Sequence, residues 1–170
     1  MPLRSDWSED RCPIARGLQT LGDPWALLVL REVLLGNNRF DGLRDGLGVA
    51  DNTLSSRLQA LVADGVLTRE PYRDGCRTRY AYRVTPAGED ALPVLNALAR
   101  WSVKHAPPAS PDTVMSIRCA RCGEDPGSAD WCTSCTEPLT AATTRWSRAS
   151  APDVLIPLVA ASGASLRPGP

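Results

Sequence analysis

Apolar residues recur at helical spacing through the first half of the chain. A nearly continuous apolar run over residues 25–35 follows Asp23-Pro24, a capping carboxylate and a proline suited to the first helical turn. Because this segment is apolar on most sides, we expect it to form the buried central helix of a domain. A shorter amphipathic helix is predicted over residues 40–47, where Phe40, Leu43 and Leu47 share one side.

A third helix is predicted over residues 51–64, with Asp51 as its cap and Asp64-Gly65 at its end. Its buried stripe consists of Leu54, Leu58 and Leu61, and its outer side is small and polar, with Asn52, Thr53, Ser55, Ser56 and Gln59. Short polar side chains can reach base edges when a helix enters the major groove of DNA. Such a face is more often simply solvated, so the interpretation depends on the next element of the chain.

A positively charged hairpin is predicted directly after this helix. Its strands cover residues 66–72 and 79–85, with a turn around Arg73-Asp74-Gly75. Five arginines against Glu70 and Asp74 give the hairpin a net charge of +3: Arg69, Arg73, Arg77, Arg79 and Arg83. Two short helices followed by an arginine-rich hairpin are the layout of a winged helix, in which the wing neutralises phosphates or enters the minor groove.

A last helix is predicted from Thr85-Pro86 to Lys104. Its apolar face comprises Leu92, Leu95, Leu98, Trp101 and Val103, and Pro93 is expected to bend it. The proline-rich stretch 106–113 then predicts a linker.

Four cysteines beyond the linker form two CxxC pairs separated by nine residues: Cys119, Cys122, Cys132 and Cys135. Four thiolates in this pattern suit a structural zinc ion, which needs no open coordination position. A redox dithiol system and an iron centre are the alternatives, because four cysteines also bind iron. We expect removal of zinc to unfold this small module and to leave the winged helix folded.

The predicted fold class is therefore α+β and mainly helical, a winged helix-turn-helix domain with a small four-cysteine zinc-binding module. We expect DNA binding and dimerisation in residues 1–105, a linker at 106–113 and the zinc-ribbon-like module at 114–140. Residues 141–170 are expected to be a low-complexity tail with a short apolar segment, Val154 to Ala161, that could pack on a partner subunit.

The sequence resembles the HxlR-type winged-helix regulators, relatives of the MarR group. The resemblance rests on Cys12-Pro-Ile, on the segments 25–36 and 39–40, on 53–69, and on 80–88 with 92–101. It implies a homodimer, expected to be a repressor, with its recognition helix at residues 51–64 and its wing at 66–85. The helix beginning near Pro86 and the N-terminal segment would build the dimer interface.

A two-fold dimer would read a pseudo-palindromic operator in double-stranded DNA, with half-sites about 34 Å apart. The resemblance also makes Arg57 a candidate phosphate or base contact. The sequence departs from the family pattern at Gly42, Gly46, Ala50 and Cys76.

Cys12 is a candidate redox sensor. It precedes Pro13 at the expected start of a helix, with Arg11 beside it and Arg16 four residues on, and both features favour the reactive thiolate. Some regulators of the resembled family sense oxidants with a cysteine at this position. The alternative is a buried cysteine that acts as a small hydrophobic residue.

Composition excludes some classes of function and leaves others open. The 170 residues carry 19 basic and 19 acidic side chains, so whole-chain charge gives no evidence for nucleic-acid or membrane binding. His105 is the single histidine, and no GxSxG, HExxH or P-loop pattern occurs, so we expect no enzyme. The polar start and the lack of a long apolar run predict a cytoplasmic, nucleoid-associated protein. The alternative function is a zinc-dependent protein-interaction module that uses the winged helix as a docking surface; a small-molecule effector is also compatible.

Overall fold

The computed structural model describes residues 6–107 and 114–161 as eleven helices and strands. In chain order they are α1 Pro13–Leu21, α2 Pro24–Leu34, α3 Phe40–Leu47, α4 Asp51–Ala63, β1 Leu67–Asp74, β2 Arg77–Val84, α5 Pro86–Glu89, α6 Leu92–His105, β3 Ile117–Cys119, β4 Thr144–Arg148 and β5 Ala151–Pro157. The predicted α+β, mainly helical class is confirmed. No described helix is long and apolar enough to cross a membrane.

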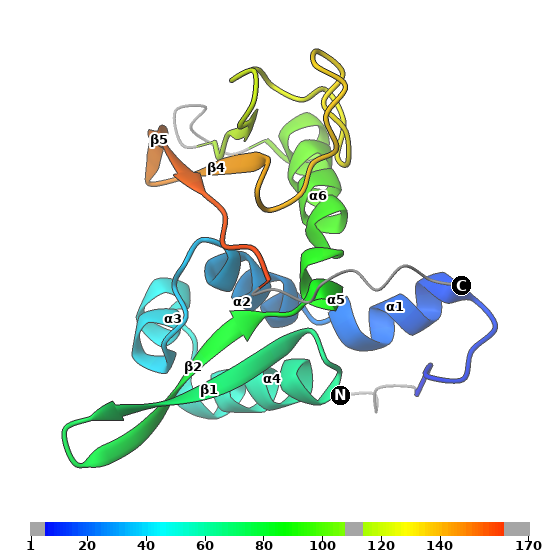
Figure 1. Ribbon diagram of the computed structural model, residues 1–170. Helices are drawn as coiled ribbons and strands as arrows, with labels where there is room; N and C mark the ends of the chain where they lie inside the picture. The colour runs from blue at the N-terminus through cyan, green and yellow to red at the C-terminus, as the bar shows by residue number, and fades with distance from the viewer. Residues whose placement is uncertain (1–5, 108–113, 162–170) are drawn as a thin grey trace, which may run out of the picture.

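Helix α2 is the central helix, as predicted. Asp23 caps it by accepting a hydrogen bond from the backbone N–H of Trp25 at 2.9 Å, and Pro24 occupies its first turn. Val29, Leu30 and Leu34 are fully buried in one core that also takes in α3, α4 and α6. Figure 1 shows α2 between the wing hairpin and the C-terminal strands.

Helices α3 and α4 and the hairpin β1–β2 form the winged helix-turn-helix. Gly48 ends α3 in the left-handed conformation, at φ 62°, which lets the chain turn into α4 within three residues. The cap of α4 is Ala50, with no side-chain hydrogen bond, so the prediction that Asp51 caps this helix is wrong: Asp51 is its first residue. The hairpin turn consists of Gly75 and Cys76, so it begins one position after Asp74, the centre of the predicted turn.

The predicted last helix is divided in two. Thr85 caps α5 by accepting a hydrogen bond from the backbone N–H of Gly88. Residues 90–91 are not helical and separate α5 from α6. Pro93 lies in the first turn of α6, where a proline costs no hydrogen bond, so it starts a helix and does not bend one. A Cβ on Gly88 would meet the carbonyl oxygen of Val66 at 2.3 Å, so this close approach requires glycine.

The expectation of a tail from residue 141 is wrong for its first part. Strand β4 pairs with both β3 and β5 in an antiparallel sheet of order β3-β4-β5. Trp146 on β4 is fully buried and donates a hydrogen bond from Nε1 to Oδ1 of Asn96 on α6 at 3.0 Å. The C-terminal segment is therefore anchored on the helical domain and extends its core. Residues 108–113 of the predicted linker and 162–170 of the predicted tail lie outside the described residues.

Candidate DNA-binding surface and four-cysteine site

Helix α4 presents a polar outer side because its leucine stripe is buried. Leu54, Leu58 and Leu61 are each 1% exposed and belong to the core around α2. Of the predicted contact residues, Asn52, Ser56 and Gln59 are exposed, and Thr53 and Ser55 are half-buried. The three exposed residues follow one another at spacings of four and three, so they lie along one side of the helix. The assignment of individual DNA contacts to them stays a prediction.

Arg57 is held against the helical domain. Its Nη2 lies 3.1 Å from Oδ2 of Asp23, the residue that caps α2, and its side chain is 28% exposed. This ion pair links the recognition helix to the start of the central helix. The ion pair positions Arg57, and its contact with phosphate or bases stays a prediction.

Ion pairs hold the wing in place and account for two of its five arginines. On one side of the hairpin, Arg79 pairs with Asp41 at the start of α3 and with Asp74 at 3.0 Å between Nε and Oδ2. These carboxylates raise the pKa of Arg79, the hydrogen bond to Asp41 contributing most. Arg83 pairs with Glu70 across the two strands. Arg79 therefore attaches the wing to α3, and its contact with DNA stays a prediction.

Two of the three remaining arginines lie at the tip of the wing. Arg73 and Arg77 flank the turn, both are exposed, and neither forms an ion pair within the described parts of the chain. Figure 1 shows the hairpin projecting from the body of the domain. Because the acidic residues of the hairpin already pair with Arg79 and Arg83, its net charge of +3 resides on Arg69, Arg73 and Arg77.

Two stacked arginines were missed by the sequence analysis as binding residues. The guanidinium of Arg39 lies 4.7 Å from the ring centroid of Tyr72, and that of Arg69 lies 4.8 Å from the centroid of Tyr80. Such stacking holds a cation in place without neutralising it. The alternation of tyrosine and arginine in the hairpin could have predicted the stacking of Arg69. Arg39 lies before α3, outside the hairpin, so no local pattern predicts its stacking on Tyr72.

Cys12 lies directly before α1, as predicted, and its side chain is exposed and forms no capping hydrogen bond. Its surroundings differ from expectation, because Arg16 donates from Nη1 to the carbonyl oxygen of Asp10 at 2.6 Å. The carboxylate of Asp10 accepts a hydrogen bond from the backbone N–H of Cys12 at 2.7 Å. An acidic side chain thus accompanies the two basic neighbours, and the redox role of Cys12 stays a prediction.

The four predicted metal ligands come together in one cluster. The Sγ atoms of Cys119, Cys122, Cys132 and Cys135 all lie within 4.8 Å of one another. The Cys119–Cys135 and Cys122–Cys132 distances are both 3.6 Å, close to the separation of about 3.8 Å that a tetrahedral ion with 2.3 Å bonds requires. A disulfide would need about 2.05 Å. The donor set therefore fits a tetrahedral metal ion.

Two equivalent turns bring these thiols together. The backbone N–H of Gly123 donates to the carbonyl of Cys119 at 2.9 Å, and that of Thr136 donates to the carbonyl of Cys132 at 2.9 Å. Gly123 and Thr136 each follow the second cysteine of a pair. Both adopt the left-handed backbone conformation, at φ 78° for Gly123 and 56° for Thr136. The CxxC spacing thus folds each cysteine pair into a tight loop with its sulfur atoms on one side.

The acid–base properties of the cluster also favour a cation. Backbone N–H groups of Cys135 and Ser134 lower the pKa of Cys132 to about 7, whereas burial and neighbouring thiols raise that of Cys135 to about 12. Four thiolates in such proximity repel one another, so all four ionise together only around a positive ion.

Comparison with known proteins agrees with this architecture. The fold and the charged wing define a winged helix-turn-helix transcriptional regulator. A sequence family described as HxlR-like helix-turn-helix matches residues 20–110, and the chain belongs to this family.

Related proteins are also named as transcriptional regulators of the helix-turn-helix type. An HTH-type transcriptional regulator of Mycobacterium tuberculosis is 38% identical over 129 residues, which cover 75% of this chain and 80% of the relative. The HTH-type transcriptional regulator YtfH of Escherichia coli is 34% identical over 93 residues, 54% of this chain and 73% of the relative.

Solved structures share the fold. The crystal structure of PA1607, a transcription factor candidate, has a TM-score of 0.58 at 28% identity and covers 79% of this chain and 84% of its own. The redox regulator HypR in its reduced form has a TM-score of 0.52 at 23% identity, covering 56% of this chain and 94% of its own, which concerns the fold alone.

Proposed function

We propose that this regulator binds a specific operator as a homodimer and represses transcription. The observation that carries the proposal is the combination of the polar side of α4 with Arg73 and Arg77 of the wing, which no carboxylate of the described residues neutralises. A polar helix side that enters the major groove reads bases, and flanking arginines neutralise phosphates. Stacked Arg39 and Arg69 add two further cations beside the wing.

Exposed apolar side chains on α1 and α6 support the dimer. Ile14 is 72% exposed and Leu18 45% on α1, while Val94 is 48%, Leu98 49% and Trp101 57% exposed on α6. The α6 residues follow at spacings of four and three, so they form one apolar stripe. A second copy that covers these stripes would present two α4 helices to a pseudo-palindromic operator.

We also propose that Cys119, Cys122, Cys132 and Cys135 hold one structural zinc ion. The distances between sulfur atoms and the turns that carry the cysteines support this. When bound, zinc would supply a cross-link among four loop positions and neutralise their charge. Leu139, which is 4% exposed, packs with Cys119 and Cys132 as a small apolar layer beneath the site.

Fluorescence anisotropy of labelled DNA tests the main proposal. The probe is DNA from upstream of the protein's own gene, titrated with the zinc-loaded chain over a range of salt concentrations. We expect tight binding that weakens linearly with the logarithm of salt concentration and that unlabelled upstream DNA displaces better than scrambled DNA. Equal displacement by both competitors would contradict operator recognition. Binding without salt dependence would contradict the phosphate contacts and favour the protein-docking alternative.

The regulatory input is proposed to act through Cys12 or through a small molecule. Cys12 is exposed at the start of α1, next to the apolar residues of the proposed dimer surface. Modification there would add bulk at the contact between subunits.

A further inference from the structure

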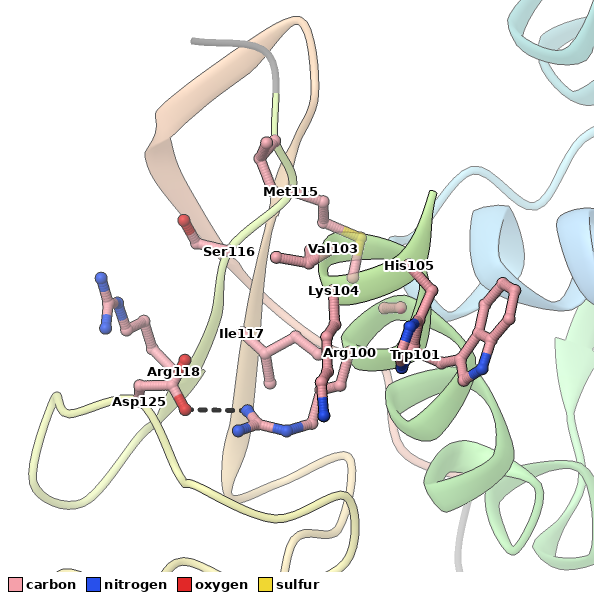
Figure 2. Close-up of a pocket in the computed structure, with 12 residues that line it drawn as sticks. Arg100, Trp101, Val103, Lys104, His105, Met115, Ser116, Ile117, Arg118 and Asp125 are labelled. Carbon is pink, nitrogen blue, oxygen red and sulfur yellow. Dashed lines mark hydrogen bonds and ion pairs between the residues drawn. The ribbon is translucent and has the colours of Figure 1, made fainter. Parts of the chain in front are cut away.

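A cleft between α6 and β3 is separate from the proposed DNA-binding surface (Figure 2). Its volume is about 600 Å³, within the range of roughly 300–1,000 Å³ common for small-molecule sites. Residues 99–105 of α6 form one wall, and residues 114–118 at the start of β3 form the other. The loop that follows Cys122 contributes Asp125 at one end.

The middle of the cleft is apolar. Val103 of α6, which is 52% exposed, faces Met115 and Ile117 across the gap (Figure 2). Ile117 belongs to the main core at 6% exposure, so this wall is fixed. Trp101 and His105 of α6 also line the cleft, and their ring centroids lie 5.3 Å apart. The surface offered to a ligand is therefore mostly apolar, with aliphatic side chains, one thioether and two aromatic rings.

The cleft carries excess positive charge. Arg100, Lys104 and Arg118 line it against one carboxylate, Asp125, so the net charge is +2. Asp125 is already engaged, because Nη1 of Arg100 lies 2.8 Å from its Oδ1. Although burial raises the pKa of Asp125, hydrogen bonds from Arg100 and the Gly127 N–H lower it overall, so this carboxylate is charged at neutral pH. Within the described residues, Lys104 and Arg118 form no ion pair.

We propose that this cleft binds a small organic anion with an apolar body, such as an aromatic carboxylate. The positive charges of Lys104 and Arg118 would attract the carboxylate, and the ring would cover Val103 and Met115. The family match ends at residue 110, before the β3 wall begins, so the cleft exists only where the C-terminal segment packs on α6. The cleft therefore depends on the packing of the C-terminal segment against α6.

Isothermal titration calorimetry of the zinc-loaded full chain with 1-naphthoate tests the site without DNA. The matched cation 1-naphthylmethylamine has the same ring system and the opposite charge. We expect saturable binding of 1-naphthoate and at least about tenfold weaker binding of the amine, because the cleft attracts anions. The double variant Lys104→Gln with Arg118→Gln removes both positive charges, keeps the side chains polar, and should also weaken naphthoate binding at least about tenfold.

The wing variant Arg73→Gln with Arg77→Gln is the matched control, since it removes two positive charges elsewhere. It should bind naphthoate as the parent does and lose affinity for DNA, whereas the cleft variant should show the reverse. Unchanged naphthoate affinity in the cleft variant, equal binding of the amine, or no saturable binding to the parent would each overturn the proposed site. Because calorimetry contains no DNA, these failures are distinct from a failure of operator binding.

Discussion

Arg148 of β4 reaches back to Glu32 in the last turn of α2, with its Nη1 at 2.9 Å from Oε1 and 2.8 Å from Oε2. Glu32 is 1% exposed, so its charge is buried within the helical domain. Nδ2 of Asn37 donates to Glu32 at 3.3 Å and to the carbonyl of Gly42 at 2.9 Å. One carboxylate thus joins the C-terminal sheet to α2 and to the start of α3.

Glu32→Gln should lower the free energy of unfolding by about 2 kcal/mol, because Arg148 loses a buried counter-charge. The matched control is Glu70→Gln, which removes an exposed pair with Arg83 and should cost less than about 1 kcal/mol. Urea unfolding of the two variants measures the difference. Equal losses would show that the buried pair adds nothing beyond a surface pair.

The same carboxylate predicts a dependence of stability on pH. Burial raises the pKa of Glu32, but hydrogen bonds from Arg148 and Asn37 outweigh it, so the pKa lies below the ordinary 4.5. A lowered pKa in the folded state stabilises the fold above the unfolded value, and this contribution is lost as pH falls through the folded value. Thermal unfolding from pH 6 to 3 should therefore show a steeper acid loss for the parent than for Glu32→Gln. Parallel profiles would refute this role.

Gly42 and Gly46, which depart from the family pattern, have a structural explanation in this network. A Cβ on Gly42 would lie 2.4 Å from Oδ1 of Asn37, and one on Gly46 would lie 3.2 Å from its Nδ2. The two glycines thus make room for Asn37. The sequence showed them as exceptions, but their reason lies in a side chain from the preceding turn.

The sequence predicted the helices well because helix caps and apolar stripes depend on residues close together in the chain. The leucine stripe of α4 and the cap of α2 each involve residues within a few positions of one another. The sheet β3-β4-β5 was missed because its strands are short and lie among Ala, Ser, Thr and Pro, and its burial depends on Trp146 meeting Asn96 from α6. The CxxC spacing predicted the cysteine cluster, whereas the ion pair of Arg57 was not predicted because its partner Asp23 is distant in sequence.

Replacing Arg73 and Arg77 by glutamine should weaken binding to all DNA sequences and reduce the salt slope by roughly 2 units, one for each lost phosphate contact. Arg16→Gln with Arg11→Gln, on the opposite end of the domain, removes the same charge and should leave the slope near that of the parent. Anisotropy titrations between 50 and 300 mM salt, about the range in which phosphate contacts weaken, provide the comparison. An equal fall in slope for both pairs would assign the effect to net charge and not to the wing.

Thr136 occupies a backbone position that Gly123 fills in the equivalent turn, with φ 56° against 78°. A β-branched residue is strained there, so Thr136→Gly should stabilise the zinc-loaded module by about 1 kcal/mol. The reciprocal Gly123→Thr should destabilise it by a similar amount. The chelator concentration that releases half of the zinc measures both effects. A lower midpoint for Thr136→Gly would show that its side chain contributes more than its backbone costs.

Zinc removal should loosen the cysteine turns before the helical core, because the four thiols are their main cross-link. Hydrogen exchange after chelation should increase at residues 119–139, while α2 and α4, whose core contains Leu30 and Leu58, stay protected. Because Trp146 and Ile117 pack in that same core, strands β3 and β4 should lose less protection than the turns. A uniform loss of protection from hydrogen exchange across the chain would show that the cysteine turns and the helical core unfold as one unit.

Cys12→Ser should abolish sensitivity to oxidation and leave DNA affinity unchanged. Diamide with glutathione joins the Cys12 and glutathione thiols in a mixed disulfide, and the two hydrogens released reduce diamide to its hydrazine. A charged tripeptide at the start of α1, beside exposed Ile14, should separate the proposed dimer and weaken operator binding. Anisotropy before and after treatment gives the response, and zinc release measured in parallel identifies any attack on the metal thiolates. Cys76→Ser, which changes the exposed thiol of the wing turn, is the control and should respond as the parent does. A parent-like response in Cys12→Ser would eliminate the sensor role, and its loss in Cys76→Ser would move the sensor to the wing.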